Sequence, residues 1–313
     1  MTTHFLYHAN CTDGLGAKYA AWKRYGEASD INYLPVNYSA NPRLPKEIVQ
    51  GDTVYLMDFC YPAKLLEELS HKVKTLVILD HHQTAFEILA EIQGGYSDVS
   101  DQQNIHSTRE WNNARVDFHL DRDRSGATLA WDFFHPDQPY PKLLSYIQDR
   151  DLWQFKLHDT NAVHEALFLL KGDMKEWDKV AEEGFDQTKL IGLGRPIVDY
   201  NQIAVERISK RAQVLDFLGL RAAIVNTTEH QSDVGSYLLQ NPKEPTDLAI
   251  LFTVHQDTVG LSFRSLKGTQ IDVATLAKTY FGGGGHFHAA GGRCNLQILG
   301  TILSGSYLPI SKI

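Results

Sequence analysis

Three side chains that bind protons or metals stand together at Asp80, His81 and His82. They follow directly on Leu76–Leu79, an apolar run that predicts a buried strand. The end of such a strand delivers reactive groups to the edge of an α/β sheet, because the backbone holds them rigidly there. Two adjacent histidines behind an aspartate are hard to explain as ordinary core residues. The triplet therefore indicates a functional site.

Other imidazole and carboxylate side chains occupy comparable places in the first half of the chain. His8 and Asp58 follow apolar strands, Asp13 follows His8, and Asp149 and Asp151 stand at the end of a predicted helix. Since parallel strands open on the same edge of a sheet, these groups are expected to converge with the triplet. A mixed set of this kind favours manganese, zinc, iron or cobalt over calcium or magnesium. One carboxylate shared by two ions would allow so many acids to coexist.

Each of these residues alone has a more ordinary explanation. Asp58 could be a turn residue, and His8 a partly buried histidine. Asp149 and Asp151 could be solvated charges at a helix end, and Cys11 a small buried hydrophobe. The set together is a stronger signal than its members.

A glycine-rich segment in the last part of the chain, Gly282–Gly285, runs into His286. Without side chains, the backbone N–H groups of such a loop can approach an anion closely, although a flexible turn is the simpler explanation. Arg264, at the end of the predicted strand Val259–Phe263, could add a bidentate phosphate contact. A surface arginine explains that residue equally well.

The elements that must position these residues alternate between strands and helices in the first half. Strands are predicted at 5–7, 31–36, 53–57 and 75–79, and helices at 13–25 and from Pro62 onward. This alternation predicts an α/β fold with a mostly parallel, doubly wound sheet. From about 85 to 113 polar residues dominate, which indicates an insertion or a long surface loop with some helix.

A second, smaller α/β domain is predicted in the last part of the chain. Gly192–Pro196 indicates a break before an amphipathic helix at about 198–218, and strands resume at 222–225. The chain is therefore divided into a first domain at 1–190, a connector helix at 191–220 and a second domain at 221–313.

The overall composition, 43% hydrophobic and 22% charged residues, is typical of an ordinary soluble globular protein. A net charge of −8 argues against a protein that holds long duplex DNA by charge alone. No apolar run is long enough to span a bilayer, and the N-terminal residues lack the pattern of a signal peptide. Three cysteines fit a reducing compartment, so we expect a cytoplasmic protein without a membrane partner.

The segments L-D-H-H at 79–82 and G-G-G-G-H at 282–286 resemble the DHH phosphoesterase family. F-R-S at 263–265 and D-V-A-T-L-A at 272–277 look like the pattern of that family's second domain. The family joins a catalytic, metal-binding domain to a smaller DHH-associated, substrate-binding domain, with the active site in the cleft between them. The order of the motifs and the domain sizes match, so the resemblance covers nearly the whole chain. It points to the oligoribonuclease and single-strand exonuclease branch.

The resemblance implies two divalent ions, usually manganese, with magnesium, cobalt or zinc as alternatives. Asp58 would bridge both ions, and His8 would bind one of them. The other ion would be bound by Asp13, His81 and Asp149.

The choice of Asp149 over Asp151 stays open at this point. Asp149 is favoured because its offset from the aromatic Trp153 fits the family's pattern better.

The remaining roles also follow from the resemblance. Asp80 would orient the neighbouring imidazole, His82 would face the substrate phosphate, and a metal-bound water would be the nucleophile. The residues that would hold the phosphate or terminal nucleotide of the substrate are Arg264, Gly283, Gly284, Gly285 and His286.

The first motif departs from the family's pattern. Many members read His-x-x-x-Asp-x-Asp, whereas this chain reads H-A-N-C-T-D-G over 8–14, with one aspartate. Cys11 or Thr12 stands where the missing carboxylate belongs, depending on a one-residue gap, and Cys11 has the expected spacing of two residues before Asp13. Either Cys11 binds as a thiolate and shifts the preference toward softer metals, or Asn10 helps, or the first ion binds weakly.

The expected activity is that of a manganese-dependent phosphodiesterase acting on short oligonucleotides or small nucleotides. An acidic chain without a basic track fits short substrates better than long strands. The alternatives are a phosphomonoesterase or exopolyphosphatase, and a non-catalytic nucleotide-binding protein. The retained ligand set argues against the last of these. RNA, DNA and small-nucleotide substrates, the polarity of cleavage and the oligomeric state stay open.

Overall fold

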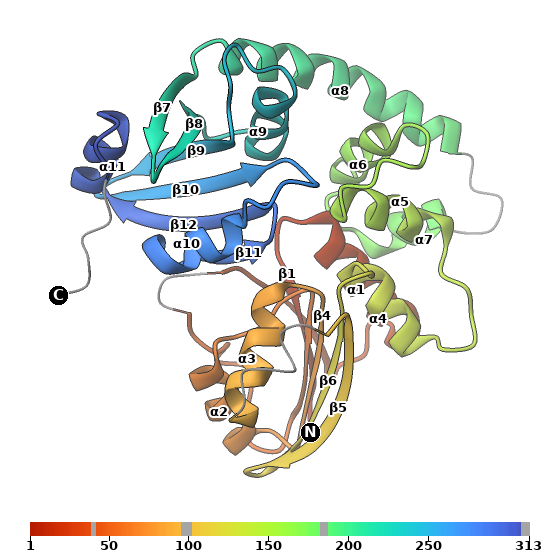
Figure 1. The fold of residues 1–313 in the computed structure, drawn as a ribbon. Helices are drawn as coiled ribbons and strands as arrows, with labels where there is room; N and C mark the ends of the chain where they lie inside the picture. Colours follow the sequence, from red (N-terminus) through yellow and green to blue (C-terminus); the bar gives the residue numbers. More distant parts are fainter. Residues whose placement is uncertain (39–41, 95–101, 182–186, 308–313) are drawn as a thin grey trace. The chain divides into compact units, whose positions relative to one another are not determined.

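The computed structural model describes residues 1–38, 42–94, 102–181 and 187–307. The chain forms two compact units, Met1–Val198 and Asp199–Ile313, and the boundary lies inside helix α8, Gln187–Ser209 (Figure 1). Among the described residues no helix is both long enough and apolar enough to cross a membrane.

The first unit is built on a six-stranded sheet in the order β2-β1-β3-β4-β6-β5. Every neighbouring pair is parallel except β5 and β6, which confirms the predicted, mostly parallel sheet. The strands are β1 (Thr3–His8), β2 (Ile31–Val36), β3 (Thr53–Met57), β4 (Thr75–Asp80), β5 (Asn104–Trp111) and β6 (Ala114–Asp121).

Both faces of this sheet are covered by helices, as expected for a doubly wound fold (Figure 1). Successive strand residues point to opposite faces: Leu6 packs in one core with Phe86 of α3, whereas Phe5 packs in the other with Trp131 of α4. The helices are α1 (Thr12–Tyr25), α2 (Ala63–Lys72), α3 (Gln83–Gln93), α4 (Gly126–Phe134), α5 (Lys142–Asp151), α6 (Thr160–Phe168) and α7 (Met174–Ala181).

The segment 85–113, predicted as an insertion or a long loop with some helix, is more regular than expected. Helix α3 continues to Gln93, and β5 pairs antiparallel with β6 from Asn104 opposite Asp121 to Trp111 opposite Ala114. Residues 95–101 lie outside the described residues. Strand β5 is an edge strand whose positions alternate between exposed and half-buried, so its apolar signal is weak.

The predicted break at 192–196 is wrong, because α8 runs through it with Pro196 inside the helix. A Cβ at Gly194 would lie 1.7 Å from the carbonyl oxygen of Ala162 in α6. The glycine therefore permits two helix backbones to approach closely, and it does not end the helix.

The second unit contains another six-stranded sheet, in the order β11-β12-β10-β9-β8-β7. Strand β8 pairs parallel with β9, and the other neighbours are antiparallel. The predicted connector helix ends at Ser209, not near 218, because 213–217 forms an edge strand instead. The elements are β7 (Gln213–Phe217), β8 (Leu220–Asn226), α9 (Gln231–Gln240), β9 (Leu248–His255), β10 (Thr258–Ser265), α10 (Val273–Phe281), β11 (Gly284–His286), β12 (Ala289–Asn295) and α11 (Leu296–Leu303).

Candidate metal centre

Three neighbouring strands of the first unit end at the predicted site residues. His8 is the last residue of β1, Asp58 follows β3 directly, and Asp80 ends β4. These strands lie side by side in parallel, so the three residues meet at one edge of the sheet. Asp58 has φ 55°, a left-handed conformation that non-glycine residues rarely adopt and that often marks functional sites.

Among the described residues of the first unit, the potential ligand atoms at this edge form three overlapping groups, and within each group they lie within 4.8 Å of one another. One of them is Asp58, Asp80, His81 and His82, and we call the other two the first and the second group. Asp58 faces residues of both. Its Oδ2 lies 3.5 Å from Nδ1 of His8, and its Oδ1 lies 3.2 Å from Nε2 of His81. The first group is His8, Cys11 and Asp58, and the second is Asp13, His81 and Asp151. We call these six residues the metal cluster.

The carboxylate of Asp13 is fixed by the N-terminus of helix α4. It accepts hydrogen bonds from the backbone N–H of Gly126 at 2.6 Å and of Ala127 at 2.9 Å. A Cβ at Gly126 would lie 2.4 Å from the Cβ of Asp58, so only glycine fits here. Gly126 was not predicted from the sequence. Its one local signal is a glycine in the first turn of a helix.

The structure places Asp151 in the metal cluster and Asp149 outside it, which contradicts the preference for Asp149. Asp151 Oδ2 lies 3.5 Å from Nε2 of His81. Asp149 instead accepts hydrogen bonds from the backbone N–H of Lys156 and Leu157, at 2.8 and 3.1 Å, and from the Thr160 hydroxyl. Residues two positions apart on a helix point about 200° away from each other, so only one of Asp149 and Asp151 can face the site. Asp149 therefore holds the turn that follows α5.

Burial and like charges perturb the acids of the metal cluster. Burial, together with the charges of Asp58 and Asp151, raises the pKa of Asp13 well above its usual value. Burial also raises the pKa of Asp58, but hydrogen bonds from His8 and His81 outweigh it and lower that pKa overall. The protein thus gathers carboxylates that repel one another.

The histidine and the thiol of the metal cluster respond to the same negative charge. Burial lowers the pKa of His81, but the charge of Asp151 and a hydrogen bond to Asp58 raise it to about 10 overall. Burial, followed by the charges of Asp58 and Asp13, raises the pKa of the Cys11 thiol well above its usual value. Without a metal, both groups therefore hold their protons.

The residues present fit divalent metal ions. Among the described residues, the buried Oδ2 atom of Asp80 has no hydrogen-bond donor, and those of Asp58 and Asp151 have only an imidazole nitrogen 3.5 Å away, of His8 and of His81 respectively. Buried carboxylate oxygens that are so poorly satisfied are costly, and a cation would supply the missing partner. Imidazole, carboxylate and thiol together suit manganese, iron, cobalt and zinc.

Comparisons with known proteins concern the fold and the sequence as a whole. No family model matches the chain. An uncharacterized protein, R106, of Acanthamoeba polyphaga mimivirus is 31% identical over 303 residues, which are 91% of this chain and 66% of that protein. The chain thus spans about two thirds of the length of this relative.

Solved structures are similar over nearly the whole chain. RecJ from Thermus thermophilus in complex with Mn²⁺ has a TM-score of 0.53 at 14% identity, covering 97% of this chain and 51% of that one. An exopolyphosphatase-related protein from Bacteroides fragilis has a TM-score of 0.52 at 13% identity, covering 97% and 91%. The chain has the fold of the DHH phosphoesterases. At these identities the likeness is one of fold.

The first two residues of the DHH triplet have separate tasks. Oδ1 of Asp80 accepts hydrogen bonds from the backbone N–H of His81 and His82, and it lies 2.7 Å from Nδ1 of His82. Asp80 thus fixes the imidazole of His82, whereas the imidazole of His81 points into the metal cluster.

The glycine-rich segment of this DHH fold is not the open loop predicted from the sequence. Gly284–His286 form strand β11, which pairs antiparallel with β12. A Cβ at Gly283 would lie 1.8 Å from the carbonyl oxygen of Gly291, and one at Gly285, where φ is 145°, would lie 2.5 Å from that of Ala289. The glycines allow two backbones to pack closely. We call β11, β12 and Gly283 the glycine hairpin.

Arg264 lies at the predicted strand end, and its guanidinium is held within the second unit. It donates to the hydroxyls of Ser262 and Ser232 at 2.9 and 2.8 Å and to the carbonyl oxygen of Phe263 at 2.7 Å. A Cβ at Gly235 would lie 2.7 Å from Cγ of Arg264, so helix α9 packs closely on this side chain. Arg264 is therefore a positioned arginine and not a loose surface one.

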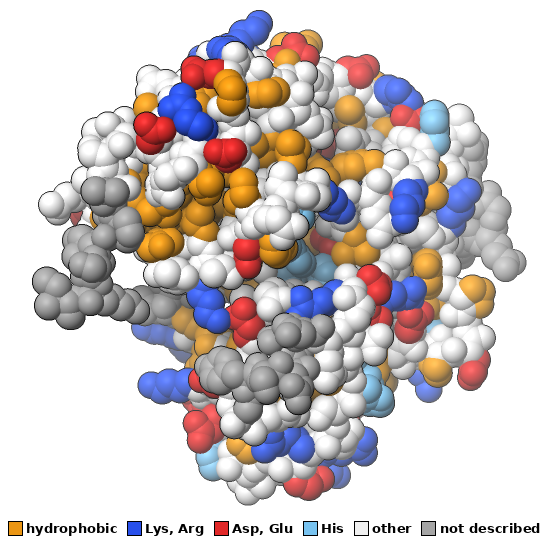
Figure 2. Space-filling view, viewed as in Figure 1, with side chains coloured by type: hydrophobic (Ala, Val, Ile, Leu, Met, Phe, Trp, Pro, Cys, Tyr) orange, Lys and Arg blue, Asp and Glu red, His pale blue; other side chains and the backbone are white. Residues whose placement is uncertain are grey.

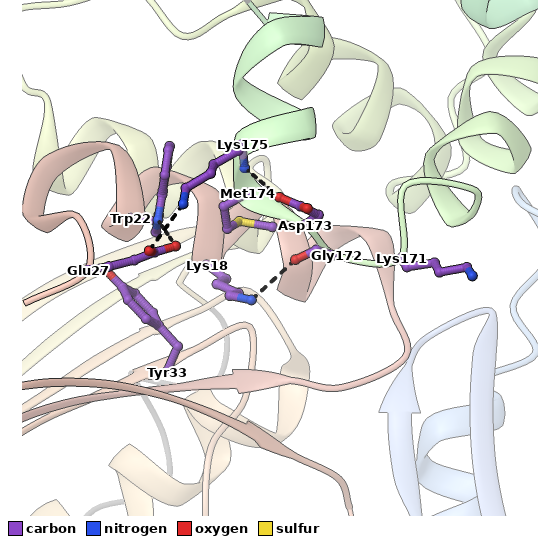
Figure 3. Close-up of a pocket in the computed structure, with 9 residues that line it drawn as sticks. All are labelled: Lys18, Trp22, Glu27, Tyr33, Lys171, Gly172, Asp173, Met174 and Lys175. Atoms are coloured by element: carbon purple, nitrogen blue, oxygen red, sulfur yellow. Dashed lines mark hydrogen bonds and ion pairs between the residues drawn. The ribbon is translucent and has the colours of Figure 1, made fainter.

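A cavity of about 410 Å³ in the first unit is lined by none of the metal-cluster residues (Figure 3). Its charges largely satisfy one another: Lys175 pairs with Glu27 at 3.5 Å, and Lys18 donates to the carbonyl oxygen of Gly172 at 3.3 Å. The lining residues are Lys18, Trp22, Glu27, Tyr33, Lys171, Gly172, Asp173, Met174 and Lys175.

Proposed function

We propose that this protein is a metal-dependent phosphodiesterase that hydrolyses short oligonucleotides or small nucleotides. The observation that carries the proposal is the position of Asp58, whose Oδ2 faces His8 of the first group and whose Oδ1 faces His81 of the second. A carboxylate placed in this way suits a bridge between two ions. The fold shared with RecJ crystallised with Mn²⁺ supports manganese as the metal.

Two ions would be held by the two groups of the metal cluster, with Asp58 common to both and Asp151 in the place first given to Asp149. Bound metal supplies a water of lowered pKa as the nucleophile. Asp80 holds Nδ1 of His82, so Nε2 of His82 is the ring nitrogen that would donate to a phosphate oxygen. Burial lowers the pKa of His82, but the charge of Asp80 outweighs it and raises that pKa overall, which favours the donating form.

The second unit would bind the substrate's phosphate or terminal nucleotide through Arg264, His286 and the backbone at 283–285. The fixed guanidinium of Arg264 supports this role, because a pre-oriented arginine loses little freedom when it binds phosphate. On the face shown in Figure 2, the described lysines and arginines are interspersed with aspartates and glutamates. This mixed surface supports short substrates over long strands. A cytoplasmic location, supported by the low cysteine content, is part of the same proposal.

The test is hydrolysis of short RNA and DNA oligonucleotides, 3′-phosphoadenosine 5′-phosphate and polyphosphate, with manganese and with chelator. We expect manganese-dependent release of mononucleotides. Replacing Asp58 by Ala should lower kcat/KM by roughly 10³-fold or more, since it removes the shared ligand. The unfolding temperature should not fall. Asp137→Ala, which removes an exposed acid, is the matched control. An Asp58→Ala enzyme as fast as the parent would refute the metal assignment.

An exopolyphosphatase is the second candidate, because an exopolyphosphatase-related protein shares the fold. Release of phosphate from polyphosphate, without cleavage of oligonucleotides, would select it. Binding of nucleotides without any turnover would instead select a non-catalytic nucleotide-binding protein.

A further inference from the structure

Tyr38 lies beside the metal cluster, two residues beyond the end of β2. Its ring centroid is 5.3 Å from that of His8 and 6.1 Å from that of His82, with the rings edge to face in both pairs. The residue as a whole is 45% exposed, although its neighbours at the site are largely buried. An aromatic surface therefore borders the two histidines.

The ring of Tyr38 is anchored on a buried aromatic pair. Its centroid lies 4.7 Å from that of Phe59, which is 1% exposed and stands perpendicular to Tyr61 at 4.8 Å. Aromatic contacts of this kind fix the orientation of a ring. A ring held in place before binding loses little conformational freedom when a ligand stacks on it.

The position of this ring relative to the two histidines suits one part of a nucleotide. His8 and His82 are the residues placed at the metal and the phosphate in the proposed function, and a nucleoside extends from that phosphate by a ribose and a base. A polyphosphate chain has no flat apolar face at the same distance. Stacking on an exposed aromatic ring discriminates in favour of the nucleotide whatever its base.

We propose that Tyr38 stacks on the nucleoside next to the bound phosphate, and that it makes this centre selective for nucleotides over polyphosphate. The proposal rests on the proposed function, because it assumes that the phosphate binds at the metal cluster. Tyr38 is a specificity residue that contacts the substrate, and no proton transfer is assigned to it.

The test compares the binding of AMP with that of ribose 5-phosphate to the full chain in the presence of manganese, by titration calorimetry. We expect the parent to bind AMP roughly 10- to 100-fold more tightly than the sugar phosphate, the range that one base–aromatic stack provides. Tyr38→Leu should abolish this preference, whereas Tyr38→Phe and Tyr38→Trp should keep it. Tyr200→Leu, which replaces a tyrosine that is 72% exposed on α8, is the control.

Equal binding of the two ligands by the parent, or an unchanged preference in Tyr38→Leu, would overturn the proposal. Should Tyr38→Leu fail to fold, the Phe and Trp variants still decide, because loss of the preference in both would exclude stacking. Binding requires no turnover. A protein that prefers AMP through Tyr38 but hydrolyses nothing would therefore refute the proposed function and not the role of Tyr38.

Discussion

The metal cluster of the first unit and the glycine hairpin of the second are both packed so tightly that a single added Cβ would not fit. A methyl group at Gly126 would strike Asp58, and one at Gly283 would strike the carbonyl oxygen of Gly291. The two regions differ in the chemical groups that this packing brings together. In the metal cluster, buried carboxylates gather against like charges, whereas in the hairpin backbone groups pair with one another.

The two sequence signals therefore have different physical causes. Buried carboxylates that repel one another are costly, so their convergence points to a cation that would bind them. A run of glycines is stable by itself when two strands need to approach closely, so it points first to packing. The metal cluster is therefore the stronger evidence for function.

The largest expected effect separates the two aspartates that flank Arg150. Asp151→Asn should weaken manganese binding by roughly 100-fold, because it removes a ligand of the second group. Asp149→Asn should instead cost about 1.5–3 kcal/mol of the free energy of unfolding, since its carboxylate holds a turn through backbone donors. Titration calorimetry with Mn²⁺ and urea unfolding measure the two quantities. If Asp149→Asn gave the larger loss of metal affinity, the assignment would have to be reversed.

A pair of glycine variants tests the contrast between the two regions directly. Gly283→Ala should destabilise the protein by about 2 kcal/mol or more while leaving metal binding unchanged, because its clash is with backbone. Gly126→Ala should weaken metal binding, because its clash is with Asp58 and Asp13. Manganese titration and thermal unfolding of both variants provide the comparison. If Gly283→Ala lost metal affinity and Gly126→Ala kept it, the contrast between the two regions would be wrong.

Cys11 allows the chemistry of the first ligand group to be tuned. Cys11→Asp supplies the carboxylate that many DHH members carry two residues before the equivalent of Asp13. We expect it to raise the affinity for Mn²⁺ relative to Zn²⁺ by about 10-fold, since carboxylates suit manganese and thiolates suit zinc. Competition between the two ions measures this ratio. An unchanged ratio would show that Cys11 is not a ligand.

A further expected effect is on the pH dependence of metal binding. The pKa of His81 is raised to about 10, so manganese must displace a proton from it, and affinity should rise with pH by up to about tenfold per unit between pH 7 and 9. Calorimetry in buffers of different ionisation enthalpy would measure the number of protons released on manganese binding. Binding without proton release would contradict the role of His81 as a ligand.

His81 also makes the stability of the metal-free protein depend on pH, but this stability falls as the pH rises. Its folded pKa lies above the unfolded value of about 6.5, so the charged His81 stabilises the metal-free protein fully below pH 6.5. That contribution is lost as the pH rises through 10.

The sequence was sufficient to predict those site residues whose positions follow directly from where a strand ends. Strands that end in His8, Asp58 and Asp80 could be identified from apolar runs, and their convergence follows from parallel pairing. The choice between Asp149 and Asp151 could not be made in this way, because it depends on how α5 is rotated about its axis by its packing. Gly126 meets Asp13 across 113 positions of the chain, and no local pattern records such a contact.

The brevity of β11 has a consequence for how the protein behaves among other chains. This strand has three residues and forms one edge of its sheet, where backbone groups would otherwise be exposed to pairing. Long, flat edges recruit strands from neighbouring molecules and promote aggregation, and short edges are one way in which proteins avoid this. An edge of three residues offers very few positions to an incoming strand. The glycine hairpin thus also ends its sheet in a form that discourages self-association.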